Sequence, residues 1–188
     1  MSSVGFHGAE AQDGLFEQLP EDPKMTAPVE APRSALVRTG ILPCQGIRAL
    51  IEGGEIFGAP EIEPNQIQPA SLDLRLGKVA YRVRASFLPG PNATVREKLE
   101  AVKFHEIDLT KGAVLESGCV YLVPLIEQLK LRSTIAAFAN PKSSTGRLDV
   151  FTRLIADRQD SFDFVGEGYT GPLFAEICPR TFSIKVRY

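Results

Sequence analysis

A succession of short, strand-like segments separated by turn residues constrains this chain more than any other feature. Leu72, Leu74 and Leu76 fall at alternate positions with polar residues between them, which predicts a half-buried strand that ends at Gly77. Further strand-like runs lie at 79–83, 105–109, 119–125, 134–139, 173–177 and 181–186. Many short strands at this spacing predict a mostly-β fold: a sandwich, a barrel or a jelly roll.

Helical patterns are few. Ile47, Leu50 and Ile51 recur at helical spacing before the glycine pair at 53–54, which predicts one short helix. Residues 86–101 are rich in proline and glycine and then charged, and they predict a loop with one helical turn.

The segment 141–155 predicts a second helix, packed on the β core. A proline and two serines open it, as favoured at a helix start near Ser143. Leu148, Phe151 and Leu154 then recur at helical spacing.

Composition sets the domain organisation. The chain has 188 residues, enough for one domain with a real core. Residues 1–35 are rich in Gly, Pro, Ala, Glu and Ser and predict a flexible N-terminal tail, which leaves 36–188 as the domain.

Charge and cysteine content exclude several classes of protein. The formal net charge is −2, without the basic excess typical of a general nucleic-acid binder. The three cysteines are far apart and odd in number, which argues against a disulfide framework and fits a reducing compartment. No apolar run is long enough to cross a membrane, and no signal-peptide pattern opens the chain, so we expect a cytoplasmic protein with no membrane partner.

A candidate anion-binding site lies at the start of the segment 141–155. Ser143 and Ser144 can donate hydroxyl hydrogen bonds to phosphate, Lys142 supplies a point charge, and Arg147 supplies a planar fork one helical turn later. These groups would suit a triphosphate. An ordinary helix cap with a solvated lysine and arginine would give the same pattern, and no GxxxxGK[ST] motif is present.

Glu176 is the second candidate, because it interrupts the otherwise apolar run 173–177. Strand alternation places it on the same face as Phe174. A carboxylate in apolar surroundings suits proton transfer. If this face is wet, however, Glu176 is merely a solvated residue.

The sequence argues against metal-dependent and histidine-based alternatives. Zinc nucleotide deaminases carry an H-x-E … P-C-x-x-C signature. Neither His7 nor His105 is followed by a glutamate at the required spacing, and Cys44 has no second cysteine after it at the required spacing. His7 falls in the predicted tail and His105 at a predicted strand edge, so we find no case for a nucleophilic triad.

Four stretches, in order, resemble the dCTP deaminase/dUTPase family. They are ILPCQGIRALIEGGEI at 41–56, QIQPASLDLRLG at 66–77, PKSSTGRL at 141–148 and GEGYTGPLFAEI at 166–177. The segment 141–155 is most similar to a bacterial subgroup of dCTP deaminases with longer chains made of two related halves.

The resemblance implies a distorted jelly roll, or β-clip, in a homotrimer whose active sites lie between subunits. It implies deamination of dCTP to dUTP and ammonia, with Mg²⁺ on the triphosphate and no zinc. By position, Lys142, Ser143 and Ser144 would hold phosphates, and Arg147 would reach the triphosphate and the attacking water. Glu176 would be the general acid/base.

The chain also departs from the family pattern. Gly166 stands where family members often carry an aspartate that contacts the nucleoside, and the segment 152–165 is longer than in short members. The sequence stops soon after the catalytic strand, so we expect a domain truncated at its C-terminus. The alternatives are therefore a dUTP pyrophosphatase of the same fold, although those enzymes usually have an apolar residue in place of Glu176, or a non-catalytic nucleotide-binding half-domain.

Overall fold

The computed structural model describes residues 2–8 and 40–188. The strands are β1 (Ser2–Gly8), β2 (Gly40–Ile41), β3 (Ile56–Gly58), β4 (Leu72–Asp73), β5 (Val79–Val83), β6 (Lys103–Asp108), β7 (Ala113–Leu115), β8 (Val120–Lys130), β9 (Ile135–Pro141), β10 (Val150–Ala156), β11 (Phe164–Val165), β12 (Thr170–Pro179) and β13 (Ile184–Val186). The helices are α1 (Cys44–Glu52), α2 (Val95–Val102) and α3 (Ser143–Arg147), and η1 (Pro64–Gln66) is a turn of 3-10 helix.

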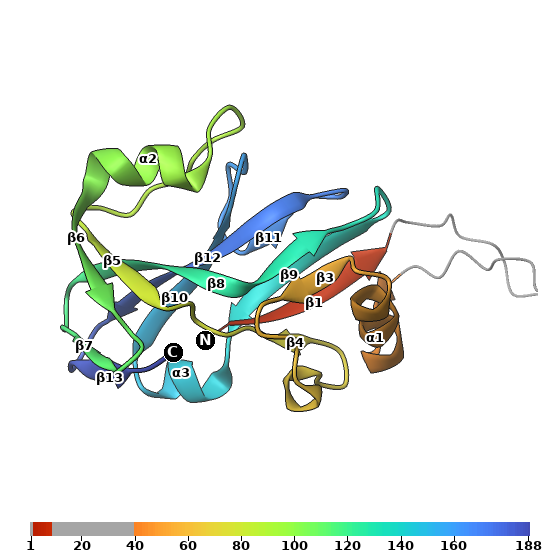
Figure 1. Cartoon of the computed structure of the whole chain (residues 1–188), viewed down its shortest axis with the longest axis horizontal. Helices are drawn as coiled ribbons and strands as arrows, with labels where there is room; N and C mark the ends of the chain where they lie inside the picture. The colour runs from red at the N-terminus through yellow and green to blue at the C-terminus, as the bar shows by residue number, and fades with distance from the viewer. Residues whose placement is uncertain (1, 9–39) are drawn as a thin grey trace, which may run out of the picture.

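Two antiparallel sheets make up most of the molecule (Figure 1). One has the order β11-β9-β1-β2, with β4 also paired to β1. The other has the order β10-β12-β8-β5-β6, with β3 paired to β8, and β13 and β7 form a separate two-stranded sheet. The predicted mostly-β fold is confirmed.

The main core lies between the two sheets. Ala137 and Ala139 of β9 belong to the same buried cluster as Leu173, Ala175 and Ile177 of β12. Burying a leucine or isoleucine side chain in such a core stabilises the fold by about 1.5–3 kcal/mol.

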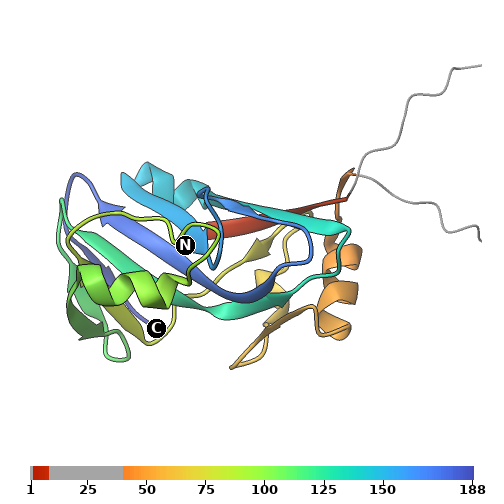
Figure 2. The same cartoon turned by 90° about the horizontal axis from the view of Figure 1, so that it is seen from above.

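A second apolar cluster covers the outer face of the β10-β12-β8 sheet. Val95 and Leu99 of α2 pack there against Leu122, Ile155 and Phe174, one residue from each of three neighbouring strands. Figure 2 shows α2 lying over this face. The centre of this sheet is therefore buried on both sides.

The helix predicted over 141–155 is confirmed at its start near Ser143 and is wrong beyond Arg147, and the two-sided burial explains the error. The helix α3 ends at Arg147, Asp149 has a positive φ of 52°, and β10 begins at Val150. Strand β10 pairs with β12 along its whole length. Leu154 and Ile155 point to opposite faces yet both are buried, which in sequence resembles helical spacing.

The predicted tail is wrong over its first residues, whereas 9–35 lie outside the described residues. Ser2–Gly8 forms β1, which pairs with β9 from Ser2↔Pro141 to Gly8↔Ile135, and Val4 is buried. Backbone pairing with β9 holds this strand, and a Gly- and Ser-rich sequence gives little side-chain signal for it.

The remaining elements agree with the sequence pattern in kind and differ in extent. The predicted helix near 47–51 is α1, with Gly53 as its C-cap. The strand predicted over 71–77 is paired regularly only at Leu72–Asp73, with an isolated bridge from Leu76 to Leu125. None of the helices in the described part of the chain has the length and apolar character that crossing a lipid bilayer requires.

The irregular segment between α1 and β5 is anchored by a buried carboxylate. Glu127 of β8 is fully buried, and both of its oxygens accept hydrogen bonds. Oε1 accepts from Gln66 Nε2 and Arg75 Nε, each at 2.8 Å, and Oε2 accepts from the Arg75 backbone N at 2.8 Å. Arg75 also donates to the backbone oxygens of Pro60 and Glu61, which ties three parts of the segment together.

This anchor extends to α3. Gln66 Nε2 donates to the backbone oxygen of Asp73, and Gln68 Nε2 donates to the Asp73 carboxylate at 3.1 Å. The same carboxylate forms an ion pair with Lys142, the N-cap residue of α3. The position of α3 therefore depends on contacts that lead back to Glu127.

Removing the Glu127 carboxylate should destabilise the fold strongly. We expect Glu127→Ala to lower the free energy of unfolding by about 3–5 kcal/mol, because it leaves Arg75 and Gln66 without their buried partner. Glu116→Ala is the matched control, since Glu116 pairs with Arg82 at the surface and should cost about 1 kcal/mol or less. Urea unfolding measures both, and equal small losses would contradict the anchoring role.

Candidate active site

Glu176 is buried in the second sheet and paired with an arginine. It lies on β12, is 3% exposed, and is the direct cross-strand partner of Arg153 on β10. Arg153 Nη2 and Nε donate to Glu176 Oε1 at 2.6 and 3.1 Å. The alternative that Glu176 is a solvated surface residue is therefore wrong.

Arg153 is itself held on several sides. Its guanidinium carbon lies 3.6 Å from the ring centroid of Phe162 and 4.9 Å from that of Phe151. Its Nη2 also donates to Ser86 Oγ at 2.8 Å. The cation is thus stacked and hydrogen-bonded, which is the environment that a guanidinium suits better than an ammonium.

A cavity of about 620 Å³ lies beside Arg153, and Glu176 itself is not among its lining residues. It extends from Pro141 and Gly146, on either side of the start of α3, to Arg153 and Asp163. Its other lining residues are Asp149, Val150, Phe151, Thr152 and Arg180. The volume lies within the range of small-molecule sites.

Asp163 brings a carboxylate to the cavity, which Asp149 also lines. It stands just before β11 with a positive φ of 61°, and its Oδ1 accepts a hydrogen bond from the Leu154 backbone N at 2.6 Å. Burial raises the pKa of Asp163, while the bond from Leu154 and the charge of Arg153 oppose the shift. The negative charge of Glu176 raises this pKa further.

The long segment 152–165 helps to hold Arg153 and to form the wall of the cavity. Besides most of β10, it supplies Phe162 and Asp163, which lie against Arg153 and line the cavity, respectively. At Gly166, where an aspartate is common in the family, an added Cβ would meet within 4 Å only the side-chain amide of Gln159 among the described residues.

The residues predicted to bind phosphate lie around α3. Ser143 and Arg147 are exposed, four positions apart on the helix. Lys142 is tied to Asp73, and Ser144 lines a second cavity of about 190 Å³ with Leu148 and Lys185 among its other walls.

Within one chain, then, the structure brings Glu176 together with Arg153 and not with Ser143 or Arg147. Gly146 is the residue of α3 that lines the cavity next to Arg153. Sequence reasoning missed Arg153, because 150–155 was assigned to a helix. A strand assignment would have paired β10 with β12 and placed a basic residue opposite Glu176.

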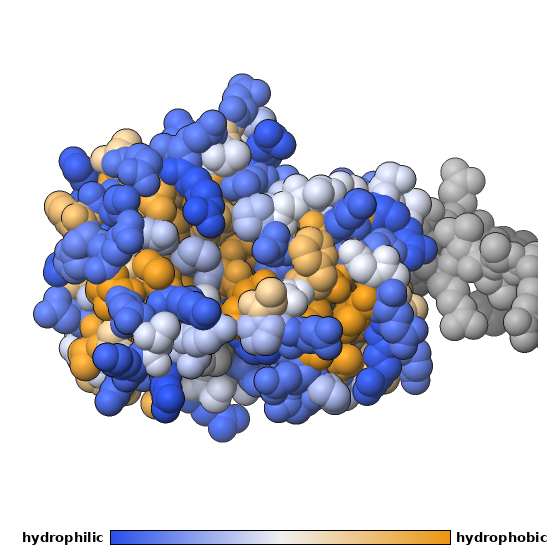
Figure 3. Space-filling view, viewed as in Figure 1, coloured by the Kyte–Doolittle hydropathy of each residue, from blue (hydrophilic) through white to orange (hydrophobic). Residues whose placement is uncertain are grey.

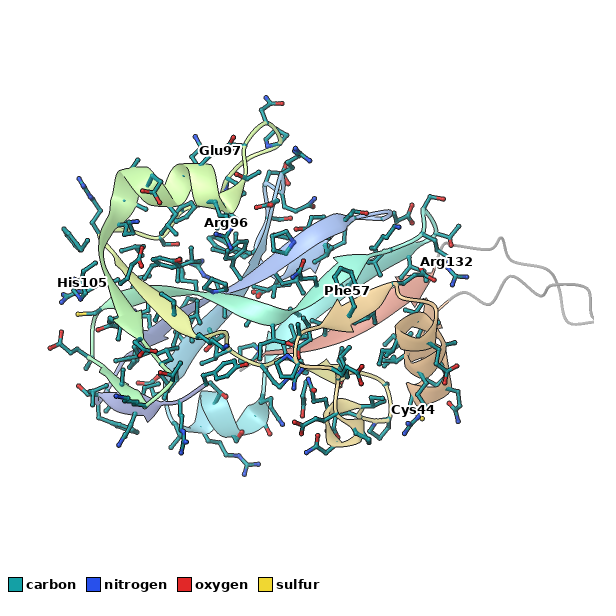
Figure 4. All side chains as sticks on the ribbon, viewed as in Figure 1. Cys44, Phe57, Arg96, Glu97, His105 and Arg132 are labelled. Carbon is teal, nitrogen blue, oxygen red and sulfur yellow. The ribbon has the colours of Figure 1, made fainter. Side chains whose placement is uncertain are left out.

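Among the described residues, no histidine or cysteine lines this cavity. His105 is exposed on β6, an edge strand, which confirms its predicted strand-edge position. Figure 4 shows His105 and Cys44 on elements at opposite sides of the molecule. Within residues 2–8 and 40–188, no three His, Cys, Asp or Glu residues gather in a way that could hold a metal ion.

Comparisons with known proteins identify the family of this chain. Residues 38–188 match the family model of the 2'-deoxycytidine 5'-triphosphate deaminase N-terminal domain. A crystal structure of 2'-deoxycytidine 5'-triphosphate deaminase from Agrobacterium tumefaciens superposes with a TM-score of 0.76 at 57% identity, covering 79% of this chain and 44% of that one.

Curated relatives are more distant. A "dCTP deaminase, dUMP-forming" of Dictyoglomus thermophilum is 29% identical over 138 residues, covering 73% of this chain and 68% of its own. A dCTP deaminase of Haemophilus influenzae is 31% identical over 122 residues, covering 61% and 62%. The chain thus spans less than half of the matched crystal chain and roughly two thirds of these relatives.

The two antiparallel sheets, the matching family model and the solved neighbour place this β domain in the deoxynucleotide-handling class. Because the family model matches most of the chain, the chain belongs to the 2'-deoxycytidine 5'-triphosphate deaminase family, and the matched region is the N-terminal domain of that family. The resemblance found in the four sequence stretches is confirmed.

The raised pKa of Asp163 predicts a pH-dependent stability. A carboxyl with a raised pKa stabilises the fold below the pKa of the unfolded chain, and this contribution is lost as the pH rises through the folded-state pKa. Asp163→Asn keeps an acceptor for the Leu154 N–H and stays neutral. We therefore expect its free energy of unfolding to exceed that of the wild type at pH 7, with the difference vanishing near pH ~3, below the ordinary pKa of an aspartate.

Urea unfolding across this pH range measures the effect. Asp108→Asn is the control, because the pKa of exposed Asp108 is lowered by hydrogen bonds from Thr110 and the sign of its effect is opposite. A wild type that is as stable as Asp163→Asn at pH ~7 would contradict the prediction.

Proposed function

We propose that this chain takes part in the hydrolytic deamination of dCTP to dUTP and ammonia, with Glu176 as the general acid/base. The observation that carries the proposal is a buried carboxylate, held in one orientation, beside a cavity that reaches the helix α3. The 57% identity to a solved 2'-deoxycytidine 5'-triphosphate deaminase supports the same reaction.

The proposed chemistry uses one carboxyl group twice. Glu176 takes a proton from water, and the hydroxide adds to the cytosine carbon that bears the amino group. The carboxyl then passes this proton to the departing amino group, which leaves as ammonia, and the proton that remains on the added oxygen moves to ring nitrogen N3 as the carbonyl of uracil forms. General acid/base catalysis of this kind contributes roughly 10²–10⁴-fold to the rate. Positioning and electrostatic stabilisation must contribute the remainder.

We propose that α3 binds the triphosphate. Ser143 and Ser144 would donate hydroxyl hydrogen bonds to phosphate oxygens, and Lys142 and Arg147 would neutralise their charge. Mg²⁺ would be held by the triphosphate oxygens and water, as is usual for this ion, and would screen the phosphate charge. The water that attacks the base is assigned to Glu176 and to no metal.

We further propose a cytoplasmic homotrimer with its sites between subunits. Ser143 and Arg147 are exposed and do not line the cavity beside Glu176, so the phosphate and base groups would meet across an interface. Exposed apolar side chains offer contact area: Phe57, labelled in Figure 4, lies on the face whose apolar areas Figure 3 shows, and Phe138 and Leu148 are also exposed.

A second reaction is favoured by the names of several relatives. The Dictyoglomus protein is called dUMP-forming, which implies a product that has lost pyrophosphate as well as the amino group. The present chain would then yield dUMP, or act on dUTP alone. Product analysis after separate incubations with dCTP and with dUTP, each with Mg²⁺, separates these outcomes. The results are dUTP with ammonia from dCTP, dUMP with ammonia and pyrophosphate from dCTP, dUMP and pyrophosphate from dUTP alone, or bound nucleotide without product.

The role of Glu176 is tested by Glu176→Gln. We expect deamination to fall by at least about 10²-fold, while the affinity for dCTP changes by less than about threefold, because the amide cannot accept and return the proton. Glu116→Gln at the surface is the matched control and should retain full activity. Ammonia release and calorimetric titration measure the two quantities, and an equal loss of both would indicate a structural role.

The shared site is tested by mixing two inactive variants. We expect Arg147→Met and Glu176→Gln to be inactive alone. Refolded together in equal amounts, they should recover about a quarter of the wild-type activity, because about a quarter of the sites then combine both intact residues. If each site forms within one chain, the mixture stays inactive.

A further inference from the structure

We propose that Arg153 is a positioning residue: it fixes one oxygen of the Glu176 carboxylate so that the other oxygen faces the reacting water. The inference rests on the proposed role of Glu176. The observation behind it is that the two oxygens of the Glu176 carboxylate differ in their hydrogen bonding. Arg153 Nε and Nη2 both donate to Glu176 Oε1. Within the described residues, Glu176 Oε2 has no hydrogen-bond partner.

The other buried carboxylate of this sheet shows what a purely structural pair looks like. Glu127 fills both oxygens with hydrogen bonds from Gln66 and Arg75, and no oxygen is left over for a ligand. Buried polar atoms are normally satisfied, so an open oxygen in a nearly inaccessible side chain needs an explanation. A water molecule that Glu176 Oε2 deprotonates supplies one.

The arginine is built to hold this orientation. Phe162 and Phe151 flank the guanidinium, and Ser86 accepts from the same nitrogen that binds Glu176. Arg153 lines the cavity of about 620 Å³, whereas Glu176 is not among its lining residues, so the arginine is the member of the pair that faces this cavity. A lysine at this position would keep the charge but could not reproduce the fork.

The charges around Glu176 come from two elements. Arg153 on β10 is the cation, and Asp163 before β11 is a nearby carboxylate whose charge interacts with both. The helix α2 and strand β8 contribute Val95, Leu99 and Leu122, which are apolar. Loss of Arg153 removes the cation that contacts the Glu176 carboxylate and leaves the charge of Asp163 near it, which favours the protonated form of Glu176.

The experiment compares Arg153→Met and Arg153→Lys with the wild type in dCTP deamination across pH. We expect Arg153→Met to lower kcat about 100-fold at pH ~7 with KM changed less than about threefold, because orientation and ionisation are lost while phosphate binding remains. The acid limb of the kcat profile should move to higher pH by about one unit or more. Arg153→Lys should restore the acid limb and regain about tenfold of the lost rate.

Arg82→Met is the matched control, since it removes another arginine–glutamate pair, whose arginine lies on β5 of the same sheet outside the site, and should leave kcat and its pH profile unchanged. An unshifted acid limb in both Arg153 variants, with rate losses that follow their losses in thermal stability, would overturn the inference. If Arg153→Met does not fold, the rates decide: kcat of Arg153→Lys should be about tenfold below that of the wild type, and an Arg153→Lys rate equal to that of Arg82→Met would overturn the inference.

A ¹³C NMR titration of the glutamate carboxyls, with the Glu176 signal identified from Glu176→Gln, gives a readout that needs no turnover. A wild type that does not deaminate dCTP refutes the proposed function. A Glu176 titration midpoint that is unaffected by Arg153→Lys and Arg153→Met refutes the control of this carboxyl by Arg153. The two failures are therefore distinguishable.

Discussion

The hydrogen bonds of Glu127 to Arg75 and Gln66 hold together the least regular part of this molecule. Between α1 and β5 the chain has little ladder pairing, so its backbone relies on side chains to fix it. A fully buried carboxylate can do this because its alternative, an unpaired charge in the core, is very unfavourable. Gln66 also contacts Asp73, and the carboxylate of Asp73 forms an ion pair with Lys142. These successive contacts connect Glu127 to α3 and so determine where α3 lies.

The second carboxylate of the sheet serves a different purpose. Glu176 and Arg153 are a cross-strand pair within an apolar outer face, under α2 and next to a cavity. Such a pair contributes little to net stability, since removing two charges from water offsets most of their attraction. What the pair does provide is a fixed geometry, because Arg153 holds one oxygen of the Glu176 carboxylate at 2.6 and 3.1 Å. A carboxylate fixed in this way is what the proposed proton transfer needs.

Sequence reasoning predicted the fold class and the strand that carries Glu176, because alternation and composition reflect a strand directly. It failed where two different structures share one pattern. Leu154 and Ile155 are adjacent and both buried, which suits a helix face as well as a strand covered on both sides, so β10 was taken for a helix and Arg153 was missed. The strand β1 was missed because backbone pairing with β9, and not side-chain pattern, places Ser2–Gly8.

The direct register between Arg153 and Glu176 limits how this family member can change. Side chains alternate along β10, so a one-residue insertion or deletion between α3 and Arg153 would turn the arginine into the core and bring an apolar neighbour opposite Glu176. Insertions and deletions are therefore tolerable after β10, in the long segment that contains Phe162 and Asp163. They are prohibited between α3 and Arg153. The number of residues between Arg147 and Arg153 is therefore constrained. Homologues that share the ion pair should keep this number, while the loops that follow β10 in them should differ in length.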